Sequence, residues 1–238
     1  MGKYGTFSRT ILDDSPVAYY RCDDASGTTL TDASGNARNG TISASGITYS
    51  QFSSMNASYE DNNSILTDGV AGELISSTNA ALVFGTSVDY TMECAFFMAG
   101  TLGVLIRDDT GAAGHIPLFS SGGFLACRTG AITNISGVAN TAYNDFNWHY
   151  MQFVRRGGAT PNSELYIDGV QLINAATGTA AVTTKWHVCR NGTLTGFVSA
   201  YVDEWSIYNG ALSTARLDAH YRAWKTQPAP SPLLTGIG

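Results

Sequence analysis

Acidic side chains are the first candidates for chemistry in this sequence, because hydrolysis of a glycosidic bond needs two carboxyl groups that face one bond. Asp203 and Glu204 are neighbours, so in a strand their side chains would point to opposite faces. Glu93 stands alone in a strand-like segment, opposite its apolar face. The sequence also lacks the Gly-x-Ser-x-Gly elbow of serine hydrolases and the glycine-rich loops that bind phosphate. We therefore expect no catalytic residues.

Asp203 is the most informative carboxylate. Alternate side chains of residues 201–207 share a largely apolar strand face, so a charge there needs compensation. A structural calcium ion would supply it, with further oxygen ligands from Asp32 and Asn36. Backbone amides of the turn at residues 209–213 would compensate the charge equally well, and the sequence leaves both alternatives open.

Four aromatic residues lie near segments rich in Asn, Ser and Asp: Tyr49, Tyr59, Tyr143 and Trp186. Exposed aromatic rings with planar polar groups beside them form stacking surfaces for sugars, so these residues are candidate binding residues. The alternative is that the rings belong to the core. The C-terminal segment 226–238 contains three spaced prolines followed by two leucines: Pro228, Pro230, Pro232, Leu233 and Leu234. This extended segment is either a docking arm for assembly or a disordered terminus.

The histidines, the cysteines and the net charge exclude other functions. The four histidines have no metal-ligand spacing, and the four cysteines are far apart, so we expect free, buried thiols.

The formal net charge is −6, only three lysines occur, and no basic patch for nucleic acid is visible. The most apolar run, residues 94–100, is far shorter than the ~20 residues of a membrane span, and a secretory signal is missing. We expect neither nucleic-acid binding nor membrane insertion.

Short apolar runs separated by Gly, Asn, Asp and Ser predict strands through most of the chain. The predicted strands are 17–22, 40–48, 81–84, 90–98, 102–107, 116–119, 124–128, 148–155, 164–167, 170–173, 186–190 and 197–208. Asp168-Gly169 predicts a tight hairpin, and Ser213 caps one predicted helix that ends near Lys225. About twelve strands without a βαβ rhythm predict an all-β, antiparallel two-sheet sandwich.

Several stretches carry a family resemblance. In chain order they are Ile11–Arg21, Asp32–Thr41, Tyr90–Phe97, Trp148–Arg155, Leu165–Gly169 and Tyr201–Ser213. They resemble landmarks of laminin-G-like domains of the concanavalin A-like lectin/glucanase superfamily, and they span residues 11–225. The chain then divides into an N-terminal arm, 1–10, this domain, 11–225, and the tail, 226–238. Glucanases of this superfamily carry their acids as Glu-x-Asp-x-(x)-Glu, and that string is missing.

The opening stretch is similar to that of minor tail proteins of bacteriophages. This resemblance implies a jelly-roll sandwich on a virion, on the tail or the capsid exterior, made in the host cytoplasm. It implies a non-enzymatic role in attachment to host-surface glycans, with other virion proteins and further copies of the chain as partners. Two alternatives remain: a structural decoration or spacer without a sugar ligand, and a glycoside hydrolase with an unrecognised site.

Overall fold

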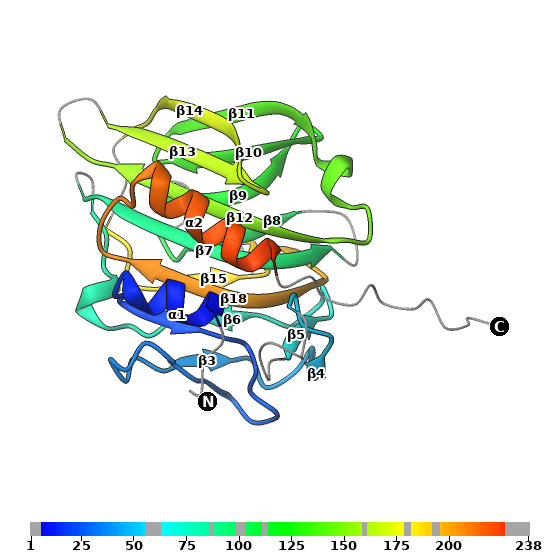
Figure 1. Ribbon diagram of the computed structural model, residues 1–238. Coiled ribbons are helices and arrows are strands. Elements are labelled where there is room, and N and C mark those ends of the chain that lie inside the picture. Colours follow the sequence, from blue (N-terminus) through cyan, green and yellow to red (C-terminus); the bar gives the residue numbers. More distant parts are fainter. Residues whose placement is uncertain are drawn as a thin grey trace.

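The computed structural model describes residues 6–55, 63–85, 88–98, 103–110, 114–158, 161–178, 182–191 and 196–226. Within these ranges, two antiparallel sheets of eight strands each form a sandwich (Figure 1). The predicted all-β, two-sheet class is confirmed. Sheet A contains, in spatial order, β14 (Val170–Ala176), β13 (Asn162–Ile167), β12 (Trp148–Arg156), β7 (Tyr90–Met98), β18 (Ala200–Tyr208), β5 (Ser64–Thr67) and β4 (Ile47–Gln51), with β1 (Ala18–Tyr20) also paired to β18.

Sheet B contains β11 (Ile132–Ala139), β10 (Phe124–Thr129), β9 (His115–Ser121), β8 (Val104–Asp108), β15 (Trp186–Val188), β6 (Leu74–Ile75), β3 (Gly40–Ile42) and β2 (Thr29–Leu30). A short ribbon pairs β16 (Arg190–Asn191) with β17 (Gly196–Phe197). Short 3-10 turns occur at η1 (Ala80–Leu82) and η3 (Asn140–Tyr143).

The inner faces of the two sheets enclose the main core. Met92, Cys94 and Phe96 of β7 belong to it and are fully buried, as the period-two alternation of that segment predicts. Trp186 and Val188 of β15 reach the same core from sheet B. All four cysteines are free and buried, which confirms the prediction made from their spacing.

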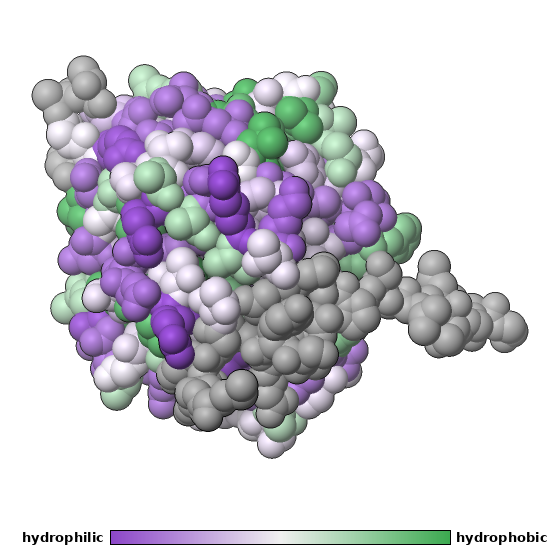
Figure 2. Space-filling model, in the orientation of Figure 1, coloured by the Kyte–Doolittle hydropathy of each residue, from purple (hydrophilic) through white to green (hydrophobic). Residues whose placement is uncertain are grey.

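Helix α2 (Thr214–Lys225) lies on the outer face of sheet A (Figure 1). Its N-terminus is capped by Ser213, whose Oγ accepts a hydrogen bond from the backbone N–H of Arg216 at 3.3 Å, so the predicted helix and its cap are confirmed. Figure 2 shows hydrophilic residues interspersed with weakly apolar ones over this helix, whose Leu217, His220 and Trp224 are buried.

A second helix, α1 (Thr6–Asp13), packs beside α2, although the sequence predicts only one helix. Its residues are mostly polar, and residues 6–10 fall in the segment predicted as an N-terminal arm. Phe7 and Ile11 are fully buried in a second apolar cluster between the helices and sheet A. Tertiary packing of these two side chains therefore stabilises a helix that intrinsic helix propensity does not predict. Neither helix is long and apolar enough to cross a membrane.

The local turn signals in the sequence have mixed outcomes. Asp168 and Gly169 have φ values of 53° and 74° and connect β13 to β14, so the predicted hairpin is confirmed. The predicted strand 81–84 is wrong, because residues 81–82 belong to the 3-10 turn η1 and residues 83–84 form no strand. There the side chain of Asn79 accepts a hydrogen bond from the N–H of Ala81 at 3.0 Å and caps the turn.

Strand β18 lies inside sheet A, and one of its edges changes partner along its length. Residues 201–202 pair with β5, whereas residues 205–207 pair with β1. On the other edge, the register against β7 shifts between Asp203 and Ser206, and Glu204 has a φ of 55°. These features define a β-bulge at the point where the edge partner changes.

Candidate functional site

The bulge in β18 changes the faces to which its side chains point. Val202 and Trp205 both lie in the inner core, with two acidic residues between them. Asp203 was predicted to share a face with Trp205 and to oppose Glu204. Both predictions are wrong, because the inserted residue interrupts the alternation of the strand. Both acidic side chains are fully buried.

Each of these acids is bound by other parts of the chain. Asp203 Oδ2 accepts hydrogen bonds from Ser54 N at 2.7 Å and from Ser53 Oγ at 3.1 Å. Ser53 and Ser54 follow β4. The alternative to calcium placed the donors to Asp203 in the turn at residues 209–213, and this position is wrong. Glu204 accepts a hydrogen bond from the hydroxyl of Tyr19.

The other two predicted calcium ligands are hydrogen-bonded to their own turn and to the segment 16–19. Asp32 accepts backbone hydrogen bonds from Tyr19, Ser34 and Arg38, at 2.8 to 3.0 Å. Asn36 uses its amide nitrogen to donate to the carbonyl of Pro16 at 3.0 Å. Within the described ranges, no group of three or more His, Cys, Asp or Glu side chains is arranged to hold a metal ion. A calcium site at Asp32, Asn36 and Asp203 stays a prediction.

The predicted sugar-stacking residues do not come together. Trp186 is fully buried in the core against Phe84 and Tyr90, so its predicted stacking role is wrong: no ring face is exposed. Tyr49 lies in β4 and Tyr143 in η3, and both are half-buried against the core. Tyr59 and the tail residues Pro228, Pro230, Pro232, Leu233 and Leu234 lie outside the described residues.

A different set of rings gathers on the outer side of sheet A, at one end of β7, β12 and β18. We call it the aromatic face: Phe52, Phe97, Phe146, Trp148 and Tyr201. Ring centroids lie 4.5 Å apart for Phe52 and Tyr201, 5.6 Å for Phe52 and Trp148, and 6.4 Å for Phe97 and Phe146. Three of the rings are half-buried, and Phe146 is 69% exposed. The sequence analysis missed this face because its members are distant in the chain.

The loop that carries Phe146 is held in an unusual conformation. Phe146 has a φ of 60°, a left-handed conformation that costs a bulky residue about 1–2 kcal/mol. Its two neighbours fix it: Asn147 donates to the Asp145 carboxylate through its backbone N–H and its side chain, each at 3.0 Å. Strain at an exposed ring points to a functional reason for displaying that ring.

His149 anchors this loop to the β13–β14 hairpin. Its Nε2 lies 2.9 Å from Asp145 Oδ1, and its Nδ1 lies 2.7 Å from Asp168 Oδ2. Burial would lower the pKa of His149, yet the hydrogen bonds and charges of Asp168 and Asp145 outweigh burial and raise it. The imidazole therefore bridges two carboxylates and holds the aromatic loop in place.

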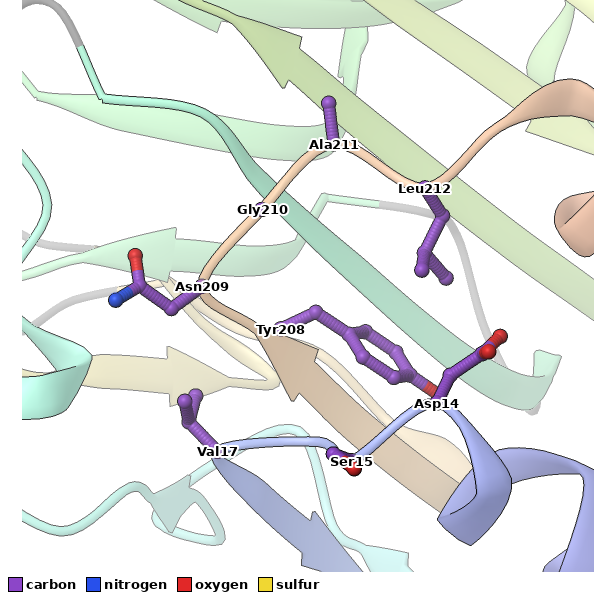
Figure 3. A pocket seen from close by; sticks show the side chains of 8 residues that line it. All are labelled: Asp14, Ser15, Val17, Tyr208, Asn209, Gly210, Ala211 and Leu212. Carbon is purple, nitrogen blue, oxygen red and sulfur yellow. The ribbon is translucent and has the colours of Figure 1, made fainter.

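A pocket of about 250 Å³ lies between the end of α1 and the turn after β18 (Figure 3). Tyr208 projects toward Asp14, and Leu212 closes the same side. From Asp14 a series of side-chain contacts runs into the interior. Asp14 Oδ2 lies 2.9 Å from His220 Nε2, and His220 Nδ1 lies 2.8 Å from Glu93 Oε2. The Asp14–His220 contact is an ion pair at hydrogen-bond distance but lacks the alignment of a linear hydrogen bond.

This buried chain, Asp14–His220–Glu93, fastens both helices to sheet A. Glu93, predicted to stand alone, also accepts a hydrogen bond from Gln152 Nε2 at 2.6 Å, and the same amide donates to the carbonyl of Leu217 in α2. Burial would lower the pKa of His220, but Glu93 and Asp14 raise it despite the opposing charge of Arg216. The chain thus ties the helices down most firmly when His220 is protonated.

A second pocket, of about 310 Å³, lies on sheet B. We call it the charged pocket, and its lining residues are Asp108, Asp109, Lys185, His187 and Arg190. Glu73 contacts two of these lining residues: its Oε2 lies 2.8 Å from His187 Nδ1, and its Oε1 lies 2.7 Å from Arg190 Nη1. Although burial alone would raise the pKa of Glu73, these two partners lower it.

Known proteins resemble this chain in fold rather than in sequence. No family model matches the sequence, and no curated protein is similar to it. The binding domain of Paraclostridial mosquitocidal protein 1 superposes with a TM-score of 0.64 and 15% identity, over 90% of this chain and 53% of that one. The botulinum neurotoxin serotype D binding domain gives 0.62 and 12%, over 91% and 52%. The binding domain of botulinum neurotoxin DC, solved with SialylT, gives 0.59 and 11%, over 90% and 52%.

The chain therefore spans about half the length of the solved chains that it matches. At these identities the likeness establishes a shared β-sandwich fold. All three structures are binding domains of the larger proteins from which they come.

Proposed function

We propose that this chain is a non-enzymatic, glycan-binding domain that a bacteriophage particle displays on its tail or capsid exterior for attachment to its host. The observation that carries the binding half is the aromatic face, with Phe146 held exposed in a left-handed conformation. Aromatic rings stack against the apolar faces of sugar rings, while carboxylate and amide groups beside them bind hydroxyls. Asp145 and Asn147 supply those groups and are exposed.

The carboxylates support a binding role over hydrolysis. A glycosidase needs two carboxyl groups that reach the same glycosidic bond. Asp203, Glu204 and Glu93 are fully buried and are hydrogen-bonded to groups of the protein. These acids stabilise the fold at the bulge and beneath the helices, where a glycan has no access.

Two further observations support the proposal. The botulinum neurotoxin DC binding domain with the same fold was solved in complex with SialylT, a sugar-bearing partner for a comparable sandwich chain. The virion location comes from the sequence landmarks that resemble laminin-G-like domains of phage minor tail proteins. Immunogold labelling of phage particles tests that location, and unlabelled particles would overturn it.

The binding half is tested with a glycan array that includes host-surface polysaccharides. Phe146→Asn removes the exposed ring, and asparagine tolerates the left-handed conformation, so its thermal stability should equal or exceed that of the wild type. Val70→Asn is the matched control, because Val70 is 73% exposed in a different turn. We expect F146N to lose most of the array signal and V70N to keep it.

Equal signals from both variants would contradict the aromatic face as the binding surface. A wild-type protein that binds no glycan, on particles that still assemble, would favour a purely structural decoration or spacer. Release of reducing sugar from host cell walls by the purified protein would instead restore the hydrolase alternative.

A further inference from the structure

Positive charge gathers on the outer face of sheet B, although the chain carries a net charge of −6. His187 lies between two inward-facing residues of β15, so its ring points outward, opposite Arg107 in the neighbouring strand. Burial lowers the pKa of Arg107; the charge of Asp108 opposes this shift, and the charges of Arg128 and Arg190 add to it. Lys185 adds a fourth cation at the charged pocket.

The acids around the charged pocket are already occupied. Asp109 accepts hydrogen bonds from Thr184 through its backbone N–H, at 3.0 Å, and its hydroxyl. Asp108 is buried and accepts a hydrogen bond from the backbone N–H of His115 at 2.7 Å. Glu73 is shared between His187 and Arg190. Each of these carboxylates is therefore already stabilised, Asp109 and Asp108 by neutral hydrogen-bond donors and Glu73 by two basic side chains.

Donors at the charged pocket remain unused. Among the described residues, the ammonium group of Lys185 has neither an ion pair nor a hydrogen bond, although the residue is half-buried. Arg190 Nε is buried and has no hydrogen-bond partner in the described part of the chain. A donor that is buried without a partner destabilises the protein unless a ligand binds it.

We propose that the charged pocket binds the carboxylate group of an acidic saccharide, at a site separate from the aromatic face. Lys185 and Arg190 bind the carboxylate, while the exposed carboxylate of Asp109, which has acceptor capacity beyond its hydrogen bonds to Thr184, binds a neighbouring hydroxyl group. The volume of about 310 Å³ lies at the lower end of the ~300–1,000 Å³ range of small-molecule sites, which suits one sugar unit. The saccharide part of this inference rests on the proposed function; the carboxylate part stands on the pocket alone.

The pocket also favours a sugar acid over the side chain of an acidic peptide. A peptide carboxylate is satisfied by cations alone. Here the exposed carboxylate of Asp109 lines the same pocket as Lys185 and Arg190. An acceptor beside two cations matches a ligand that carries an acid and hydroxyl groups on one ring.

The test compares two monosaccharides that differ only at one carbon. Glucuronic acid carries a carboxylate where glucose carries a hydroxymethyl group, and acetate supplies the carboxylate without the ring. Each is titrated into isotope-labelled protein, and amide chemical shifts report the site. Lys185→Gln removes the unpaired cation, and Lys225→Gln is the matched control at the end of α2, where the ammonium lies 5.4 Å from the centroid of the Tyr221 ring.

We expect glucuronic acid to shift amides of β8 and β15 and to bind more tightly than glucose or acetate. K185Q should weaken this binding about tenfold, since a hydrogen bond to a charged group is lost, and high salt should weaken it further. K225Q and F146N should leave it unchanged. Equal binding of acetate would overturn the saccharide part. Equal effects of K185Q and K225Q, or no shift with glucuronic acid, would overturn the whole inference.

The two proposals can fail separately. A protein that binds glucuronic acid at sheet B but loses no array signal in F146N refutes the aromatic face and leaves the charged pocket standing. Loss of glucuronic acid binding in F146N would instead show that the two sites are not separate.

Discussion

The buried chain Asp14–His220–Glu93 makes a sharp prediction about pH and stability. Because the folded protein raises the pKa of His220, the folded state holds a proton that the unfolded state releases above about pH 6.5. The stabilisation is fully present below that pH and is lost as the pH rises through the folded pKa. His149, whose pKa is also raised, contributes in the same direction.

The substitution Glu93→Gln removes the buried counter-charge of His220. Glu93 and His220 are both fully buried, and their contact is 2.8 Å. Removing one partner of a buried ion pair costs about 3–5 kcal/mol; Asp14 still faces Nε2 of His220, but Nδ1 loses its charged partner. For a chain of this size each kcal/mol shifts the melting temperature by roughly 2–4 °C, so we expect E93Q to melt roughly 6–20 °C lower at pH 6.

Thermal unfolding followed by circular dichroism from pH 6 to pH 9 measures both effects. The wild type should lose stability as the pH rises, at no more than about 1.4 kcal/mol per pH unit for each proton. E93Q should be less stable and less sensitive to pH. Asp218→Asn is the control, because Asp218 forms only an exposed pair with Arg222 on the same helix. An E93Q protein with wild-type stability, or with an unchanged pH dependence, would refute this reasoning.

Three further outcomes follow from other parts of the structure. Gly169→Ala should destabilise the protein by roughly 1–3 kcal/mol in urea unfolding, because Gly169 has a φ of 74° and an added Cβ would lie 2.5 Å from the ring of Tyr221. Gly122→Ala is the control: Gly122 has a φ of 57° and an added Cβ would meet no atom within 4 Å, so the loss of stability should be smaller. Burial and then Arg155 lower the pKa of His115 to about 3, so stability should fall as the pH drops from 6.5 toward 3, and less steeply in His115→Asn. A chelator should leave the melting temperature unchanged, since backbone amides satisfy Asp32 and Asp203; a clear drop would establish the calcium site.

Local signals in the sequence predicted the elements that local forces decide. Asp168-Gly169 forms the expected hairpin, since both residues tolerate positive φ, and Ser213 caps the expected helix. Helix α1 was missed because its stability comes from burying Phe7 and Ile11 against distant residues. The fold class depends on the pattern of apolar runs and turn residues over the whole chain, so missing one short helix did not change the predicted class.

The sites depended on facts that no single segment contains. The bulge at Glu204 arises where β18 changes its edge partner from β5 to β1, and no residue type announces that change. Trp186 was expected near a loop but lies in the core. The aromatic face joins residues from four segments, and its one local signal was Phe146 flanked by Asp145 and Asn147.

The position of β18 has a consequence for biosynthesis. This strand is synthesised after its three neighbours, yet it lies between β7 on one side and β5 and β1 on the other. Until residues 200–208 have emerged, those three strands expose unpaired edges that favour aggregation. Closure of the sandwich must therefore follow the synthesis of nearly the whole domain, and a nascent chain stalled before β18 should require chaperones to stay in solution.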